Sequence, residues 1–144
     1  MTIVPMGQAD LDAVATIESE DGDVRWTRQN FEKELKGEFM RFFLAVEPPE
    51  ILGYGGYWVA ESEAQITNLV VRKEFRCKGI GRRLVEFILD CARSEECKTC
   101  TLEVRKSNAH AQSLYRSLGF EAKGTRPKLY KDPEEDAVLM ETNL

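Results

Sequence analysis

The hydrophobic positions in the first part of the chain have the spacing of amphipathic helices. Residues 10–17 carry apolar side chains three and four positions apart, which predicts a short helix. Thr27 is a favourable helix N-cap, and it predicts a second helix that ends at Gly37. The sequence therefore predicts two helices before its first long apolar run.

Apolar and aromatic residues then form three runs that predict strands, at 39–46, 51–60 and 66–71. The second run, ILGYGGYWVA, contains two adjacent glycines, Gly55 and Gly56. Glycine inside a strand is typical of a bulge or of a close approach by a neighbouring backbone. We expect one of these two features in this strand.

Helical spacing returns in the second half of the chain. From Gly79 onward, apolar residues fall on one face as far as Cys91. A later helix begins with Ser107 or Asn108 as its N-cap and ends at Gly119, a favourable C-cap residue. Both helices follow strand-like runs, so each predicts a strand-to-helix connection.

Three further strand-like runs complete the pattern, at 99–104, 120–124 and 137–141. The order of helices and strands is ααβββαβαββ, which indicates an α/β fold with a mixed central sheet flanked by helices. A chain of 144 residues fits one domain with a sizeable core, so we expect a single domain over residues 1–144.

The overall charge and hydropathy exclude several classes of protein. The net charge of −5 argues against direct binding to nucleic acid. No apolar run is long enough to cross a membrane, and the first residues lack the pattern of a signal peptide. We therefore expect a cytoplasmic protein without a membrane partner, and the sequence does not indicate its oligomeric state.

The four cysteines do not form a recognisable metal or disulfide pattern. Cys97 and Cys100 make one CxxC pair, but the chain has a single histidine and no second pair at a suitable spacing. A structural zinc site needs about four ligands, so we expect no metal. The pair leads into a strand-like run, whereas a redox CxxC opens a helix. We interpret these cysteines as reduced thiols with a packing role.

The stretch RCKGIG, Arg76 to Gly81, joins an apolar strand to an amphipathic helix and carries several positive charges. Backbone N–H groups and the helix dipole converge at such a junction, and glycines allow an anion to approach closely. Leu84 stands where a dinucleotide-binding loop has its third small residue. Arg82 and Arg83 replace the Lys-Ser/Thr of an NTPase loop. The loop is predicted to bind the phosphates of a different ligand.

The pattern Arg76-x-x-Gly79-x-Gly81 resembles the pyrophosphate loop of the GNAT acetyltransferases. The segment LEVRKSNAHAQSLYRSLGF, residues 102–120, is similar to the second half of the same fold and to its RimI-like branch of ribosomal-protein-alanine N-acetyltransferases. EDAVLM at residues 135–140 and Trp26-Thr27 also resemble that branch. The resemblance implies a single-domain GNAT acyltransferase fold with acetyl-CoA as cosubstrate and no metal.

The resemblance implies that Glu103 is the catalytic base and Tyr115 the catalytic acid. In TCTLEV, Leu102 and Val104 point to one face of a strand and Glu103 to the other. A phenol with a pKa near 10 is protonated at neutral pH and can donate to a leaving thiolate. The alternatives are a solvated glutamate at a strand end and a tyrosine that only packs in the core.

The resemblance also implies a coenzyme site. The loop would hold the pyrophosphate, the backbone of the preceding strand would pair with the pantetheine arm, and Asn108 would bind the coenzyme or serve only as a helix cap. The residues of this expected site are Leu69, Val70, Val71, Arg76, Cys77, Lys78, Gly79, Ile80, Gly81, Arg82 and Asn108. A covalent route through Cys77 is less economical than direct attack by the amine, and His110 is expected on the surface.

The implied acceptor is the N-terminal amine of a protein, with alanine first and a ribosomal protein as one candidate, attacked directly in a ternary complex. Trp26, Tyr57 and Tyr130 are candidate walls of a peptide groove. Leu129 replaces the first of two adjacent tyrosines that the branch often has, so the peptide specificity stays open. Acidic stretches at residues 18–23 and 132–136 would attract a basic peptide or would simply be solvated.

Two other functions remain open from the sequence alone. One is a GNAT acetyltransferase that acts on a small-molecule amine or on a lysine side chain. The other is a non-catalytic module that binds acyl-CoA, although the presence of both Glu103 and Tyr115 favours an enzyme.

Overall fold

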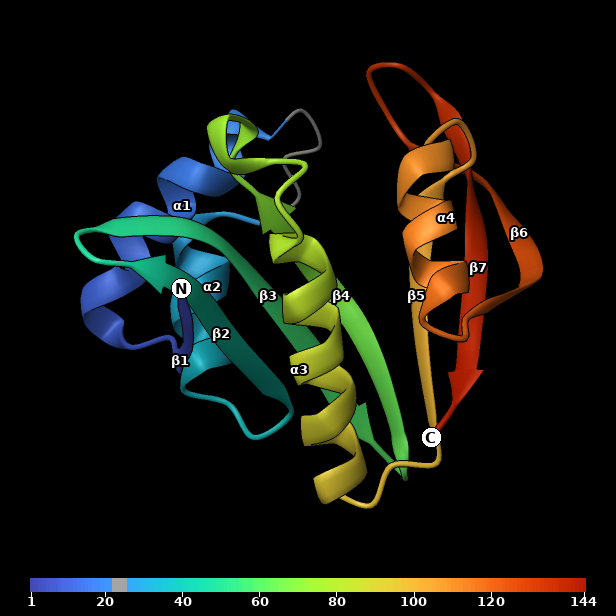
Figure 1. Cartoon of the computed structure of the whole chain (residues 1–144), viewed down its shortest axis with the longest axis horizontal. Coiled ribbons are helices and arrows are strands. Elements are labelled where there is room, and N and C mark those ends of the chain that lie inside the picture. Colours follow the sequence, from blue (N-terminus) through green and yellow to red (C-terminus); the bar gives the residue numbers. More distant parts are fainter. Residues whose placement is uncertain (22–25) are drawn as a thin grey trace.

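In the computed structural model, which describes residues 1–21 and 26–144, seven strands form one mixed sheet in the order β1-β2-β3-β4-β5-β7-β6 (Figure 1). The strands are β1 (Thr2–Pro5), β2 (Met40–Glu47), β3 (Glu50–Ala60), β4 (Glu63–Val71), β5 (Thr99–Arg105), β6 (Glu121–Tyr130) and β7 (Glu135–Asn143). The α-helices are α1 (Leu11–Glu20), α2 (Arg28–Leu35), α3 (Ile80–Ser94) and α4 (Ala109–Ser117). The expected α/β class and mixed sheet are confirmed.

Helices cover both faces of the first half of the sheet. Tyr54 on β3 packs in one buried cluster with Phe31 of α2 and Val14 of α1. Its neighbour Gly55 points the other way, where a Cβ atom would meet Ile88 of α3 at 3.2 Å. Successive residues of a strand face opposite sides, so α1 and α2 lie on one face and α3 on the other. This double cover explains why β3 has buried residues without alternation.

The sheet opens between β4 and β5, and this opening is the feature that creates room for a ligand. The two strands pair in parallel only from Glu63 with Thr99 to Ile66 with Leu102. Beyond that point β4 stays on β3 and β5 stays on β7, and the two strands diverge in Figure 1. The register of β3 and β4 shifts at this level, which leaves Thr67 as an extra residue. A bulge of this kind bends its strand, which directs the end of β4 away from β5.

The same shift tests the expectation for the glycine pair in β3. The register changes between Gly56 and Tyr57, and a Cβ atom at Gly56 would lie 2.6 Å from the ring of Phe42. The register shift at the glycine pair is therefore confirmed, but the extra residue of the bulge is Thr67 of β4, and the tightest contact at Gly56 is with a side-chain ring rather than with a neighbouring backbone. Glycine is required at residue 56 because the buried ring leaves no room for a side chain.

Other elements differ from the sequence-based expectation in extent. The strand β1 was not predicted, because its four residues include Pro5 and become a strand only by pairing with β2. β6 continues to Tyr130 rather than ending near residue 124, with a register shift at Lys128, whose φ is +54°. Among the helices of the described residues, none is long and apolar enough to span a membrane.

Candidate active site

The loop before α3 presents an open helix N-terminus. Gly79 is the N-cap, with φ +81°, a left-handed conformation that glycine adopts without strain. No side chain caps this helix in the described part of the chain, so the first N–H groups of α3 lack a protein partner there. The N-terminus of a helix favours an anion through these N–H groups and the helix dipole.

A cavity of about 740 Å³ lies against this loop, the end of β4 and α4. Its volume falls in the range of small-molecule and cofactor sites. Ten of the eleven residues expected to bind the coenzyme line it: Leu69, Val70, Val71, Arg76, Cys77, Gly79, Ile80, Gly81, Arg82 and Asn108. Lys78 does not line it, and its ammonium lies 5.8 Å from the ring centroid of Phe75 instead.

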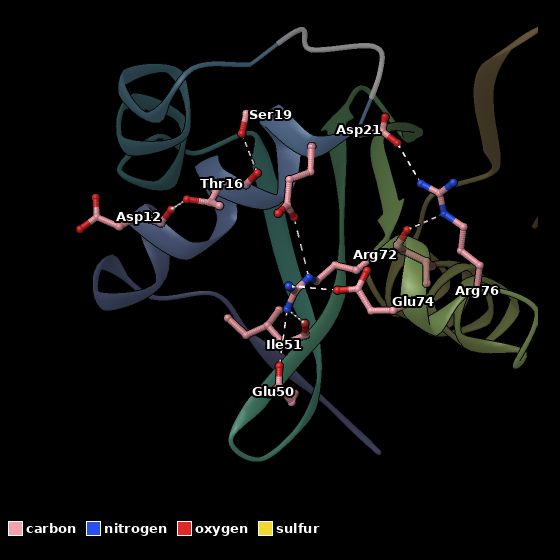
Figure 2. A network of polar contacts seen from close by, with 11 residues as sticks. Asp12, Thr16, Ser19, Asp21, Glu50, Ile51, Arg72, Glu74 and Arg76 are labelled. Carbon is pink, nitrogen blue, oxygen red and sulfur yellow. Dashed lines mark hydrogen bonds and ion pairs between the residues drawn. The ribbon is translucent and has the colours of Figure 1, made fainter.

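Two arginines supply positive charge at the loop end of this cavity. Arg82 donates to the Ser117 hydroxyl at 2.5 Å. Arg76 donates to the carbonyl of Val71 at 2.9 Å. It also pairs with Asp21 at 3.4 Å, as Figure 2 shows. The pair with Asp21 links the loop to the end of α1. Sequence analysis could not predict this ion pair, because its two residues are 55 positions apart.

A second, smaller cavity of about 220 Å³ lies beside the first. Leu69, Val70, Asn108 and Tyr115 line both cavities, whereas Glu103 lines only the second. The structure thus brings the two candidate catalytic residues together at the opening between β4 and β5. Tyr115 stands where the two cavities meet, and Glu103 stands on the side of the smaller one.

Glu103 occupies the middle of β5 between two buried apolar residues, Leu102 and Val104. Its side chain is 11% exposed, so it is shielded from most of the solvent. Arg126 of β6 places one guanidinium nitrogen 3.2 Å from Oε1 and 3.5 Å from Oε2. Sequence reasoning missed this partner, because the two residues are 23 positions apart and belong to strands that do not pair with each other.

Tyr115 combines a packing role with a place at the site. Its ring meets Phe120 edge-on, with 5.9 Å between the ring centroids, and the residue is 8% exposed. Burial raises the pKa of Tyr115 to about 12. The hydroxyl therefore stays protonated at neutral pH, as a proton donor must.

Asn108 and His110 lie at the start of α4. Asn108 is the N-cap, and its side-chain oxygen accepts a hydrogen bond from the Ala111 N–H at 3.1 Å. It also lines both cavities, so its two expected roles are compatible. Ser107, the alternative cap, bonds to Glu135 instead. His110 is exposed at the rim of the larger cavity.

Two of the three aromatic residues expected around a peptide groove, Trp26 and Tyr130, line the smaller cavity. The expectation for Tyr57 is wrong. Its ring is 1% exposed on the α3 side of the sheet, and its hydroxyl donates to Glu95. Because β3 is buried on both faces, its sequence shows no polar–apolar alternation that would indicate the face on which Tyr57 lies.

The acidic stretches mix buried and solvent-exposed residues. Glu18 is buried and accepts hydrogen bonds from the Tyr54 hydroxyl and the Trp26 N–H, at the wall of the smaller cavity. Glu135 accepts from Arg105 in a hydrogen-bonded ion pair. Asp23 lies outside the described residues. Sequence reasoning did not identify Glu18 as a buried residue of this site, because its position on α1 matches a solvated end of the helix equally well.

The cysteines show no nucleophile or metal site outside the two cavities. Cys97 and Cys100 are buried free thiols, and burial raises the pKa of Cys100 to about 12. A thiol with so high a pKa is a weak nucleophile at neutral pH. In residues 1–21 and 26–144, no group of three or more His, Cys, Asp or Glu side chains is placed to hold a metal ion.

Comparison with known proteins places this geometry in a family. Residues 11–120 match the acetyltransferase (GNAT) family. A putative [ribosomal protein bS18]-alanine N-acetyltransferase of Bacillus subtilis is 33% identical over 132 residues, which cover 91% of this chain and 87% of that protein. The structure of the ribosomal-protein-S18-alanine N-acetyltransferase from Escherichia coli superposes with a TM-score of 0.90 at 31% identity, covering 99% of this chain and 92% of that one. Arabidopsis thaliana NAA60 in complex with acetyl-CoA has the same fold, with a TM-score of 0.88, 17% identity and coverage of 99% and 98% of the two chains.

Proposed function

The chain belongs to the acetyltransferase (GNAT) family, and on this premise we propose that it transfers an acetyl group from acetyl-CoA to the N-terminal amine of a protein that begins with alanine. Ribosomal protein bS18 is the proposed acceptor, because the relatives with about a third of residues identical are named for that reaction. The observation that carries the mechanism is the position of Tyr115 between two adjoining cavities, with Glu103 at the smaller one. Residues 1–144 act as one domain, and a ribosomal acceptor would place the enzyme in the cytoplasm.

Acetyl-CoA would occupy the larger cavity. Its pyrophosphate would bind the N–H groups at the start of α3, with Arg76 and Arg82 beside it. Beyond Ile66, the edge of β4 that faces β5 has no strand partner in the described residues, so the pantetheine amides can pair with Leu69–Val71. The acetyl group would then lie at the opening of the sheet, next to Tyr115.

The acceptor amine would enter through the smaller cavity. Glu103 takes a proton from the amine, and the amine nitrogen attacks the acetyl carbon. As the tetrahedral intermediate collapses, the carbon–sulfur bond breaks and Tyr115 donates a proton to the departing thiolate. The second proton on the attacking nitrogen then restores the Tyr115 phenol, and Glu103 releases its own proton to solvent. The products are the N-acetyl peptide and coenzyme A with a free thiol. Both protein groups that act in these steps line the smaller cavity, and Tyr115 lines the larger cavity as well.

An N-terminal amine suits this site better than a lysine. Its pKa is about 8, against about 10.4 for a lysine side chain, so less work is needed to deprotonate it. The smaller cavity, of about 220 Å³, has aromatic walls at Trp26 and Tyr130. The lower pKa of the amine and this aromatic wall support a protein N-terminus as the group that enters, and the names of the relatives support alanine as its first residue.

Thiol release from acetyl-CoA with a panel of acceptors tests the proposed function. The panel contains peptides that begin with alanine, the same peptides with a blocked N-terminus, and a polyamine. Turnover is expected with the free peptides and not with the blocked ones. Turnover only on the polyamine would retain the family and the donor but remove the proposed acceptor. Coenzyme binding without turnover on any amine would favour a non-catalytic module.

Arg76→Gln is expected to raise the KM for acetyl-CoA by roughly tenfold while kcat changes by less than about twofold. The reason is the loss of a charged donor at the loop end of the larger cavity, since Arg76 does not line the smaller cavity that contains Glu103. Steady-state kinetics with varied acetyl-CoA measures both constants. Arg83→Gln is the matched control, because Arg83 lies in the first turn of α3 but does not line the cavity. An equal rise in KM for both variants would show that only the overall charge matters.

A further inference from the structure

Arg126 is the charged group in contact with Glu103 that the proposed reaction does not use. Its guanidinium lies 3.2 Å from Oε1 and 3.5 Å from Oε2, so it is shared between both oxygens of the carboxylate. The side chain is 63% exposed, whereas that of Glu103 is 11% exposed. A solvent-exposed cation thus lies on a carboxylate that is otherwise shielded from solvent.

Arg126 and Glu103 lie on strands that are not neighbours in the sheet, so the contact depends on the length of the arginine side chain. Arg126 on β6 is level with Ala137 of β7, and Glu103 on β5 is level with Leu139 of the same strand. β7 therefore separates the two residues, and two strand spacings amount to about 10 Å. A long arginine must extend across β7 to reach the carboxylate. Arg126 does not line either cavity, so it approaches Glu103 from outside the proposed path of the acceptor.

The arriving acceptor carries the same charge as Arg126. An N-terminal amine with a pKa of about 8 is mostly an ammonium ion at neutral pH, and it must come within hydrogen-bonding distance of Glu103. Two cations a few ångströms apart repel each other, and the repulsion is larger where water is partly excluded. The ammonium and the guanidinium therefore compete for one carboxylate.

From this geometry we infer that Arg126 is a further acceptor-site residue, which pairs with Glu103 in the empty site and which the ammonium of the acceptor displaces. This inference rests on the proposed function, because it takes Glu103 as the group that receives the amine. The displacement costs little, since the Arg126 side chain is exposed and an ion pair with an exposed partner changes an affinity by only about two- to fivefold. Because the acceptor must first displace Arg126, the ion pair between Arg126 and Glu103 weakens acceptor binding by a similarly small factor.

Arg126→Gln should therefore improve acceptor binding. The KM for an alanine-starting peptide is expected to fall about two- to fivefold at low ionic strength, with kcat within about twofold of the wild-type value. The difference should shrink at high salt, which screens the exposed cation. Arg126→Lys keeps the charge and should keep a KM close to that of the wild type.

Lys123→Gln is the matched control for a general change of charge. Lys123 lies on the same strand, pairs with Glu121 at 3.3 Å and touches neither cavity. The Lys123→Gln variant removes one positive charge but leaves the contact between Arg126 and Glu103 intact. Its KM for the peptide should therefore stay at the wild-type value. Thermal unfolding of each variant checks that the fold is retained.

Titration of the peptide onto inactive protein provides a measurement apart from turnover. In a Glu103→Gln background, Arg126→Gln should leave the peptide Kd unchanged. Without the carboxylate, the ion pair no longer holds the exposed Arg126 side chain beside the amine, so neither the competition nor the repulsion remains. A KM that rises, or a tenfold loss of kcat at constant KM, would show that Arg126 orients Glu103 and would overturn the inference. An equal gain in affinity in the Glu103→Gln background would also overturn it.

The wild-type enzyme in the same assay separates this inference from the proposed function. Turnover of the free peptide by the wild type, with no gain in Arg126→Gln, would reject the competition and leave the proposed function standing. A wild type that neither binds nor acetylates the peptide would reject the acceptor, and the inference would fail with it.

Discussion

Glu103→Gln is expected to lower kcat for an alanine-starting peptide by about 10²- to 10⁴-fold, the range for the loss of a positioned general base. Glutamine keeps the shape of the side chain and can hydrogen-bond the amine, but it cannot take its proton. The KM for acetyl-CoA should stay within about twofold, because Glu103 lines the smaller cavity and not the larger one. Steady-state thiol release measures kcat, and titration with acetyl-CoA measures donor binding directly.

The loss of activity must be separated from a loss of structure. Glu103→Gln also breaks the ion pair with Arg126, but that arginine is 63% exposed, so the free energy of unfolding should change by about 1 kcal/mol or less. Glu121→Gln is a matched control on β6, since Glu121 is exposed and outside both cavities. A kcat for Glu103→Gln within tenfold of the wild type would mean that another group, or water alone, removes the proton.

The sequence was sufficient where a feature depends on neighbours along the chain. α4 is an example, because Asn108 caps it, Gly119 ends it with φ +99°, and Tyr115 packs on Phe120 beyond it. The loop before α3 is another, since the left-handed conformation of Gly79 and the open helix start follow from local geometry. These two segments contain most of the residues that line the larger cavity, so its composition could be predicted.

The sequence was insufficient where a feature depends on which strands lie side by side. The contact of Arg126 with Glu103 crosses β7, and the pair of Asp21 with Arg76 joins α1 to a loop 55 residues later. Tyr57 was assigned to the wrong face for a related reason, because a strand buried on both sides shows no alternation. Long-range pairing and the choice of face are settled by packing, which a single sequence does not display.

The opening of the sheet connects the fold to the proposed chemistry. Thr67 is the extra residue where β4 turns away from β5, and the strand edge at Leu69–Val71 becomes available beyond it. The same divergence exposes Glu103 on β5 to the space that α4 and Tyr115 close from the other side. One irregularity in strand register therefore provides both a place for the donor and the path of the acceptor to it.

Tyr115→Phe is expected to lower kcat by about 10²- to 10³-fold with little change in either KM. The variant removes only the hydroxyl, so the ring can keep its edge-on contact with Phe120 and the fold should be retained. Without a donor, the thiolate must leave unprotonated or take its proton from water. The measurements are kcat and both KM values, together with thermal unfolding to confirm that the ring still packs.

The dependence on pH sharpens this prediction. The pKa of Tyr115 is raised to about 12 by burial, so the proton is present at all pH values well below 12 and is lost only as the pH rises through that value. The ratio of wild-type to Tyr115→Phe kcat should therefore stay constant from about pH 7 to about pH 10. A ratio that falls towards one near pH 10 would show that the phenol ionises too early to serve as the acid.

The Tyr130→Phe variant tests whether the proton donor is Tyr115 or Tyr130, the other tyrosine that lines the smaller cavity. Tyr130 is also buried at this cavity, but it does not line the larger one, where the sulfur of the donor would enter. Its ring carries the guanidinium of Arg105 at 4.6 Å, which indicates that it supports the wall of the acceptor site. Tyr130→Phe is expected to change kcat by less than about tenfold. A larger loss for Tyr130→Phe than for Tyr115→Phe would transfer the role of proton donor to Tyr130.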